Sequence, residues 1–230
     1  MTTPNPNAVP ADPAAATDLL LIRHGETAWN AERRLQGHLD IPLNPEGERQ
    51  AALLAGALAA QTVDAVVSSD LMRARQTAQA LAAARGLVVQ QDEALRERGY
   101  GGFEGLLYSE IEQRFPAEFA AWQARDVDAR LSEGRNRAET FRAFFARATG
   151  AILRLAAAHP GRTLALVAHG GVLECAYRLA RGLPLETPRD FKVYNASINR
   201  FRYHPSSGLL ELCSWGEVEH LRPVVLDELP

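Results

Sequence analysis

The 230-residue sequence predicts an α/β fold, with a single domain built on a mostly parallel sheet. Three short runs rich in aliphatic residues, at 19–22, 64–69 and 163–168, are too short for helices and suit strands buried on both faces. Each run leads directly into a segment with helical periodicity, which predicts helices on both faces of the sheet. Alternation near the C-terminus indicates an antiparallel edge strand.

Cap and turn signals predict the elements of the first half of the chain. Residues 1–17, rich in Pro, Ala and Asn, are expected to form a disordered tail ahead of a domain over residues 18–230. Thr27 is the expected N-cap of a helix after the first strand. Asn44 followed by Pro45 predicts a second helix, to about residue 60. The next expected elements are a strand at 64–69, a helix at 70–86 and a strand at 87–90.

The periodicity breaks down over residues 92–137, where aromatic residues are mixed with many charges. Long insertions between a strand and a helix are usually functional, so this segment is a candidate cap over a site. Within it, two short helices are expected at 109–114 and 117–124. Regular patterns return after it, and the expected elements are a helix at 138–158, a strand at 163–168, a helix to 181, a strand at 192–204 and a paired strand at 209–215.

The composition excludes several classes of function. A net charge of −3 and a pI of about 6.1 argue against a general nucleic-acid or membrane-surface binder. The two cysteines, Cys175 and Cys213, are too few for a disulfide framework and are expected as free thiols in a reducing compartment. No run approaches the ~20 apolar residues of a membrane helix, and the N-terminus lacks the basic region of a signal peptide. We therefore expect a cytoplasmic protein, a monomer or homodimer, whose partner is a small molecule.

Polar residues stand where three of the expected strands end. Carboxyl ends of parallel strands meet at one edge of a sheet, so these residues are expected to converge. A glycine turn before a helix N-terminus favours an anion, and arginine suits phosphate oxygens. Carboxylates at metal-ligand spacing are missing, so no metal is expected. The converging residues are Arg23 and His24, Ser68 and Ser69 leading to Arg73, and His169 with Gly170.

These residue types fit phosphoryl transfer, which needs an in-line nucleophile and positive charge around the phosphoryl oxygens. His24 fits the nucleophile if its imidazole is neutral and its far N–H is held by a backbone carbonyl. Arg23, Arg73 and a protonated His169 fit the charge clamp. Further donors to the phosphate are the side chain of Asn30 and the backbone N–H of Gly170.

Five blocks of sequence, in order, carry a family resemblance. They are LIRHGETAWN at 21–30, RRLQG at 33–37, SSDLMRARQTA at 68–78, LRERGYGGFEG at 95–105 and VAHGGVL at 167–173. Together they resemble the histidine phosphatase superfamily, which includes the cofactor-dependent phosphoglycerate mutases. The resemblance implies a phosphoglycerate mutase-like fold whose cap, at about 98–137, sets substrate choice.

The resemblance assigns the same roles to the residues above and adds three more. Gln36 and Gly37 are placed in the phosphate- or substrate-binding loop, and Glu97 matches the position of the general acid. Glu97 must be protonated to donate at neutral pH, which requires burial or nearby negative charge to raise its pKa. Glu104 remains an alternative acid, because motif register favours Glu97 whereas spacing does not decide between them.

Three functions are compatible with these residues. The leading one is a phosphomonoesterase that hydrolyses small phosphate esters through a phosphohistidine on His24, with no cofactor. The second is a phosphoglycerate mutase primed by bisphosphoglycerate, since residues 97–101 resemble the mutase block ERxYG. A catalytically inactive phospho-ligand-binding relative is the third. The cap offers Arg114, Arg125 and Arg130 but no lysine, which suits one phosphate better than two and favours hydrolysis of a small phosphorylated metabolite.

Overall fold

The computed structural model describes residues 14–222. Residues 1–13 of the tail expected at 1–17 therefore lie outside the described residues. Thr17 lies inside the first strand instead of the tail, and only 1% of it is exposed. Its hydroxyl binds the carbonyls of Ala156 and His159, each at 2.9 Å, so a short polar residue is fixed where composition alone indicated disorder.

The sheet of the described residues has six strands in the order β3-β2-β4-β1-β5-β6. Strands β3, β2, β4 and β1 run parallel, and the hairpin of β5 and β6 forms an antiparallel edge next to β1. This arrangement confirms the predicted mostly parallel sheet. The strands are β1 (Thr17–Arg23), β2 (Ala65–Ser68), β3 (Val89–Gln91), β4 (Thr163–Ala168), β5 (Ile198–His204) and β6 (Leu209–Glu217).

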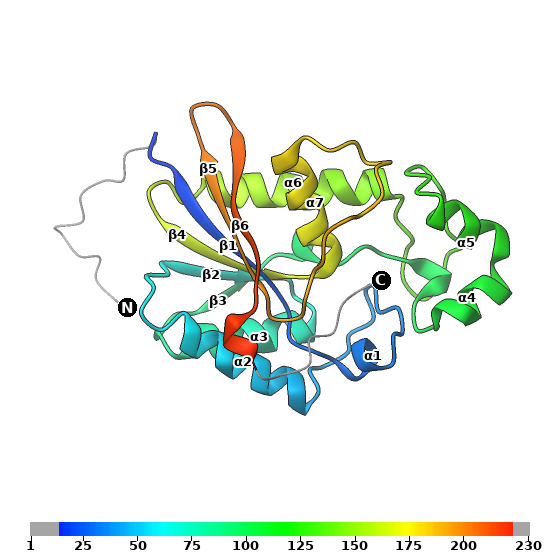
Figure 1. The fold of residues 1–230 in the computed structure, drawn as a ribbon, viewed down its shortest axis with the longest axis horizontal. Helices are drawn as coiled ribbons and strands as arrows, with labels where there is room; N and C mark the ends of the chain where they lie inside the picture. The colour runs from blue at the N-terminus through cyan, green and yellow to red at the C-terminus, as the bar shows by residue number, and fades with distance from the viewer. Residues whose placement is uncertain (1–13, 223–230) are drawn as a thin grey trace.

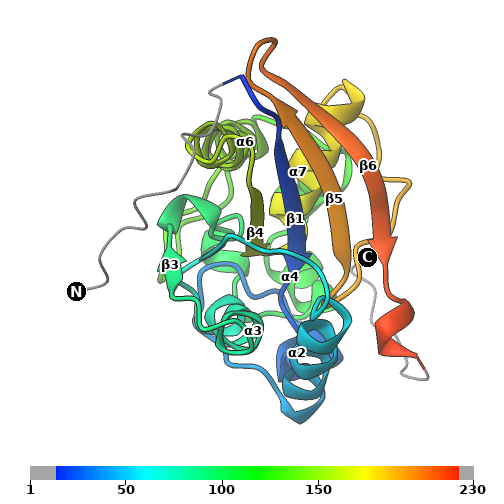
Figure 2. The same ribbon diagram turned by 90° about the vertical axis from the view of Figure 1, so that its left-hand side faces the viewer.

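Helices cover both faces of this sheet (Figures 1 and 2). Leu19 and Leu21 of β1 belong to the apolar core that includes α6 (Phe141–Ala157) and α7 (Gly170–Arg181). Leu20 and Ile22 belong to the opposite core, with α2 (Pro45–Ala57) and α3 (Met72–Ala83). The alternation of neighbours along β1 explains why its four aliphatic residues are all buried. No helix between residues 14 and 222 has the length and hydrophobicity to cross a bilayer.

Two of the predicted helix starts are formed by the expected caps. Thr27 begins α1 (Ala28–Ala31) with a capping box, in which Asn30 bonds back to the Thr27 backbone. The Asn44 side chain accepts from Gly47 N–H at 2.8 Å ahead of Pro45, which opens α2. Both signals are local in sequence, so they could be read without tertiary information.

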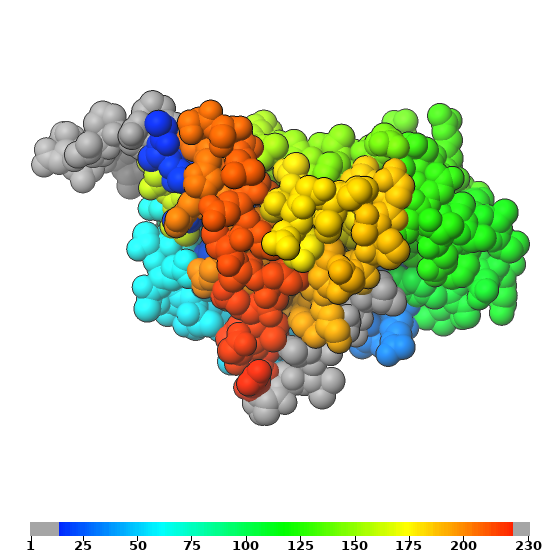
Figure 3. Space-filling view, turned by 45° about the horizontal axis from the view of Figure 1, so that its top comes forward, coloured from blue at the N-terminus to red at the C-terminus, as the bar shows by residue number. Residues whose placement is uncertain are grey.

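The insertion between β3 and α6 stands beyond the carboxyl ends of the parallel strands (Figure 1). It contains α4 (Tyr108–Arg114) and α5 (Pro116–Gln123), which agree with the two short helices predicted there. A small apolar core of its own, including Phe103, Ile111 and Leu131, holds it together. In the space-filling view it forms a green lobe at one end of the molecule, bordered by the segment that follows α7 (Figure 3).

The strand expected at 192–204 is shorter than predicted, because β5 begins only at Ile198. Residues 192–197 turn away from the sheet edge and bind the end of β1 instead. Ala196 takes a left-handed conformation with φ of 52°, and its N–H approaches the carbonyls of Arg23 and His24 at 3.1 and 3.2 Å. Backbone groups that would extend the ladder are thus used to hold the loop that carries His24.

Candidate active site

The register of the sheet brings the three predicted strand ends together. Arg23 pairs with Ala168, and Ser68 pairs with Val167, so β1, β4 and β2 end at the same level. The backbone N–H of His24 then donates to the Ala168 carbonyl at 3.0 Å. The convergence predicted from strand-end residues is therefore observed.

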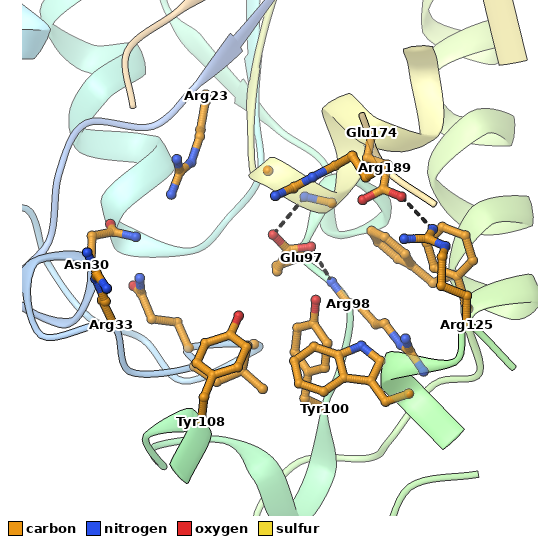
Figure 4. A pocket seen from close by; sticks show the side chains of 18 of the residues that line it. Arg23, Asn30, Arg33, Glu97, Arg98, Tyr100, Tyr108, Arg125, Glu174 and Arg189 are labelled. Atoms are coloured by element: carbon orange, nitrogen blue, oxygen red, sulfur yellow. Dashed lines mark hydrogen bonds and ion pairs between the residues drawn. The ribbon is translucent and has the colours of Figure 1, made fainter. Parts of the chain in front are cut away.

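A cavity of about 870 Å³ opens at this edge, between the strand ends, the cap and the segment after α7. Figure 4 shows Arg23 and Asn30 along one side and Glu97 opposite them, all directed toward the same space. His169 is fully buried and is not among the lining residues, but its ring centroid lies 5.1 Å from that of His24. The predicted residues that line the cavity are Arg23, His24, Asn30, Gln36, Gly37, Arg73, Glu97 and Gly170.

His24 is built as a neutral nucleophile. Its Nδ1 lies 2.7 Å from the Gly25 carbonyl, and because a carbonyl only accepts, Nδ1 carries the proton and Nε2 keeps its lone pair. Burial, followed by the charges of Arg73 and Arg23, lowers the pKa of His24 well below its usual value. The turn itself is fixed by a hydrogen bond from Gly25 N–H to the Thr77 hydroxyl at 3.0 Å.

Two buried arginines supply fixed positive charge beside His24. Arg23 Nη1 donates to the Val193 carbonyl at 2.7 Å, and Arg73 donates to the carbonyls of Gly37 and Leu39 at 2.8 and 2.9 Å. Burial lowers the pKa of Arg73 to about 10, although nearby carboxylates, first Glu97, oppose the shift. Arg73 therefore remains charged at neutral pH, and its orientation is set by backbone carbonyls.

His169, expected as an imidazolium, lies in an environment that disfavours its charged form. Its Nε2 lies 2.8 Å from the Ser69 hydroxyl, while its buried Nδ1 has no hydrogen-bond partner within residues 14–222. Burial lowers the pKa of His169 well below its usual value, and the charges of Arg73 and Arg23 add to the shift. This environment disfavours an imidazolium, whereas Arg23 and Arg73 supply positive charge beside the site.

Glu97 and Glu104 occupy different environments, which separates the two candidate acids. Glu97 lines the cavity, and its carboxylate accepts from the N–H groups of Arg98 and Gly171 at 2.8 and 3.0 Å (Figure 4). Glu104 is not among the lining residues, and it binds the backbone N–H groups of His38 and Tyr100. The structure thus places Glu97 at the site and gives Glu104 the task of holding loops together.

The remaining predicted phosphate-binding positions are set by local backbone geometry. The Asn30 oxygen accepts from Thr27 N–H at 3.1 Å, which leaves its amide nitrogen directed into the cavity (Figure 4). Gly37 has φ of 53°, and a Cβ there would come within 2.1 Å of the Glu104 carboxylate, so glycine is required. Gln36 is buried beside it, and Gly170 is the first residue of α7.

Asn195 is a site residue that sequence reasoning missed. It is 2% exposed, and its amide nitrogen donates to the His24 carbonyl at 3.0 Å and approaches the Asn30 oxygen at 3.4 Å. It therefore ties the loop of the nucleophile to a phosphate donor. The polar Asn-Ala-Ser triplet at 195–197, which interrupts the expected strand, is the signal that could have revealed it.

The cations of the cavity differ from those expected in the cap. Of the three arginines expected to supply charge there, Arg114, Arg125 and Arg130, only Arg125 lines the cavity, and it is paired with Glu174 at 2.7 Å. The additional cations come from the segment after α1, from the block of Glu97 and from the segment after α7. They are Arg33, Arg34, Arg98, Arg189 and Lys192.

We expect activity without a metal ion. Within the described part of the chain, no three His, Cys, Asp or Glu side chains are grouped as metal ligands. The imidazoles of the site lie beside Arg23 and Arg73, whose charges repel a cation. Assays of phosphate-ester hydrolysis before and after exhaustive chelation should give the same kcat/KM. Strict dependence on an added divalent cation would contradict the charge clamp.

Comparison with known proteins is consistent with this geometry. The sequence model of the histidine phosphatase superfamily (branch 1) matches residues 19–216. Phosphoglycerate mutase-like protein 4 of Arabidopsis thaliana is 38% identical over 207 residues, 89% of this chain and 86% of that protein. Probable phosphoglycerate mutase GpmB of Yersinia enterocolitica is 38% identical over 218 residues, 92% of this chain and 98% of that protein.

A solved structure of a phosphatase is also similar. The native mycobacterial glucosyl-3-phosphoglycerate phosphatase superposes with a TM-score of 0.76 at 31% identity. The match covers 88% of this chain and 100% of that one. The similarity therefore extends over the sheet, the flanking helices and the cap.

Proposed function

Because the chain belongs to the histidine phosphatase superfamily (branch 1), we propose that it is a phosphomonoesterase acting through a phosphohistidine at His24. One observation carries this proposal. The neutral Nε2 of His24 lines a cavity in which Arg23 and Arg73 are the fixed charges beside it. A neutral nucleophile next to a preorganised pair of cations is what transfer of a phosphoryl dianion requires.

In the first step, the Nε2 lone pair of His24 attacks phosphorus while the bond from phosphorus to the ester oxygen breaks. Glu97, in its acid form, gives its proton to that oxygen, so the leaving group departs as a neutral alcohol. Arg23 and Arg73 stabilise the charge on the transferred oxygens. The N–H of Gly170, at the start of α7, is a further donor to them.

In the second step, a water oxygen attacks the phosphorus of phosphohistidine while Glu97, now a carboxylate, takes a proton from that water. The phosphorus–nitrogen bond breaks and its electron pair returns to Nε2 of His24. The products are inorganic phosphate and a regenerated site, with Nδ1 still held by the Gly25 carbonyl. No cofactor is needed for this cycle.

A phosphoglycerate mutase is the second candidate, and the cations along the cavity favour it. Arg98, Arg189 and Lys192 could hold a second anionic group beyond the clamp. Against this, Arg125 is paired with Glu174, and the lining acids Asp126 and Asp190 offset further charge. A cavity of about 870 Å³ also exceeds what a three-carbon ester fills, which leaves room for water and for larger leaving groups.

We expect hydrolysis to exceed transfer. The enzyme is first phosphorylated with a labelled ester and freed of excess substrate. The fate of the label is then followed in water, with and without 3-phosphoglycerate. Release of labelled inorganic phosphate at a rate that 3-phosphoglycerate does not change supports a phosphatase. Label that persists in water and moves rapidly onto 3-phosphoglycerate makes the protein a mutase.

The proposed substrate is a small phosphorylated metabolite, and we place the reaction in the cytoplasm. Cys175 is buried and Cys213 exposed, and both are free thiols, which supports a reducing compartment.

A further inference from the structure

The residue proposed as general acid lies on backbone without regular secondary structure. Glu97 is placed between two short 3-10 turns, η1 (Glu93–Leu95) and η2 (Gly101–Phe103), at the base of the cap. A catalytic carboxyl group must be held within a fraction of an ångström, because a displacement of about 1 Å can cost on the order of 10²-fold in rate. Residues outside the irregular segment between η1 and η2 therefore have to fix the backbone of Glu97.

Arg147 of α6 fixes the backbone that carries Glu97. Its Nη1 donates to the carbonyls of Ala94 and Arg96, each at 3.0 Å, and its Nη2 donates to the carbonyl of Glu97 itself at 3.0 Å. One guanidinium thus binds three carbonyls of the segment that leads to the acid. The side chain is 24% exposed and lies over the Phe144 ring at 5.1 Å, which restricts its position further.

Glu139 holds Arg147 from the other side. Its carboxylate accepts from Arg147 Nε at 2.8 Å and from Nη2 at 2.6 Å, so every N–H of the guanidinium has an acceptor. The same carboxylate accepts from Gly99 N–H at 2.9 Å, two residues beyond Glu97. The backbone on both sides of Glu97 is therefore fastened to one ion pair.

His38 adds a second donor to the same carbonyl. Its Nε2 lies 2.7 Å from the backbone carbonyl oxygen of Glu97, and its own backbone N–H donates to the Glu104 carboxylate. His38 follows Gly37, whose carbonyl accepts from Arg73. The position of the acid is in this way coupled to the loop that orients the phosphate clamp.

We propose that Arg147, paired with Glu139, is a positioning residue that sets the place of the Glu97 carboxyl group for proton transfer to the leaving group. The proposal rests on the proposed function, in which Glu97 is the acid. Arg147 does not line the cavity, so it acts on the reaction through the residues that it holds, the Glu97 backbone first among them, and not by contact with the substrate. Its planar fork makes these bonds to three carbonyls and a carboxylate, a pattern that the point charge of lysine cannot reproduce.

The same helix supplies a matched control. Arg154 lies further along α6 and pairs with Asp92, which caps the first turn of the same connection. It carries the same charge and reaches the same segment, but it does not bind the carbonyls next to Glu97. Arg147→Lys and Arg154→Lys therefore make the same chemical change on one helix, and only the first removes the bonds to the acid's backbone.

The test measures kcat/KM of each variant on glycerol phosphate, whose alkoxide needs a proton, and on nitrophenyl phosphate, whose phenolate leaves unaided. We expect Arg147→Lys to lose on the order of 10²-fold on the alkyl ester and far less on the aryl ester. Arg154→Lys should leave the ratio of the two values unchanged. Equal losses of Arg147→Lys on both esters would mean a merely structural role and overturn the proposal.

Glu139→Gln keeps the test decisive if Arg147→Lys does not fold. It removes one charge of the pair while leaving the arginine in place, and it should shift the alkyl-to-aryl ratio in the same direction by a smaller factor. An unchanged ratio overturns the proposal.

Glu97→Gln, measured in parallel, separates the positioning role of Arg147 from the assignment of Glu97 as the acid. If Glu97→Gln shows the split and the Arg147 and Glu139 variants do not, the positioning role alone fails. If Glu97→Gln shows no split, the acid assignment fails and the positioning role fails with it.

Discussion

Replacing His24 by alanine is expected to lower kcat/KM for every phosphate ester by a factor on the order of 10⁴–10⁶, the range that loss of a covalent nucleophile produces. The reason is that the cavity offers no substitute. The neighbouring imidazole of His169 has its Nε2 bound to Ser69, is fully buried and is not among the lining residues. Arg23 and Arg73 can still bind phosphate in the variant, so affinity for phosphate should survive while turnover does not.

The measurement is a brief mixing with a labelled monoester followed by an alkaline quench. In the native enzyme, acid-labile label should be recovered on the peptide that contains His24, and in His24→Ala no label should be found. His204→Ala is a suitable control, because this histidine belongs to the β5–β6 hairpin and pairs with Glu211 at the surface. Turnover of His24→Ala within about tenfold of the native rate, less than one misplaced catalytic group costs, would rule out the assignment.

The parts of the fold that were predicted are those with local signals. The aliphatic run of β1 and the caps Thr27 and Asn44 each depend on residues within a few positions of one another. The strand predicted at 192–204 begins only at residue 198, because backbone groups of Val193, Ala196 and Ser197 bind the end of β1, about 170 residues away in sequence. A period-two pattern carries no information about such a long-range partner.

The residues of the site also divide into those that the sequence predicted and those that it did not. Arg23, His24, Arg73 and Gly170 were found because parallel topology alone brings strand ends to one edge. The lowered pKa of His169 was not predicted, since it depends on burial beside two arginines rather than on the residue type. Asn195 and Arg147 act through backbone carbonyls, which every residue carries, so the sequence does not show which carbonyls they bind.

Glu97→Gln is expected to lose on the order of 10²–10⁴-fold in kcat/KM on alkyl phosphates, the usual contribution of general acid catalysis, and much less on nitrophenyl phosphate. An alkyl ester expels a strongly basic alkoxide that cannot leave without a proton, whereas nitrophenolate leaves unaided. The amide keeps the shape of the side chain, but its single oxygen can accept from only one of the two N–H groups that bind separate oxygens of Glu97, those of Arg98 and Gly171. The lost hydrogen bond should slow both esters alike, whereas the lost proton slows only the alkyl ester, so the ratio of the two rates isolates the role of the acid.

Glu104→Gln is the matched control for this prediction, because it changes a carboxylate seven residues further along the same block. Glu104 binds the N–H groups of His38 and Tyr100 and the amide of Asn136, so its loss loosens loops around the clamp and should affect both esters alike. The ratio of alkyl to aryl rates should thus fall for Glu97→Gln and stay constant for Glu104→Gln. Equal losses on both esters for Glu97→Gln would make Glu97 a structural residue, and a selective loss for Glu104→Gln would transfer the role of the acid to Glu104.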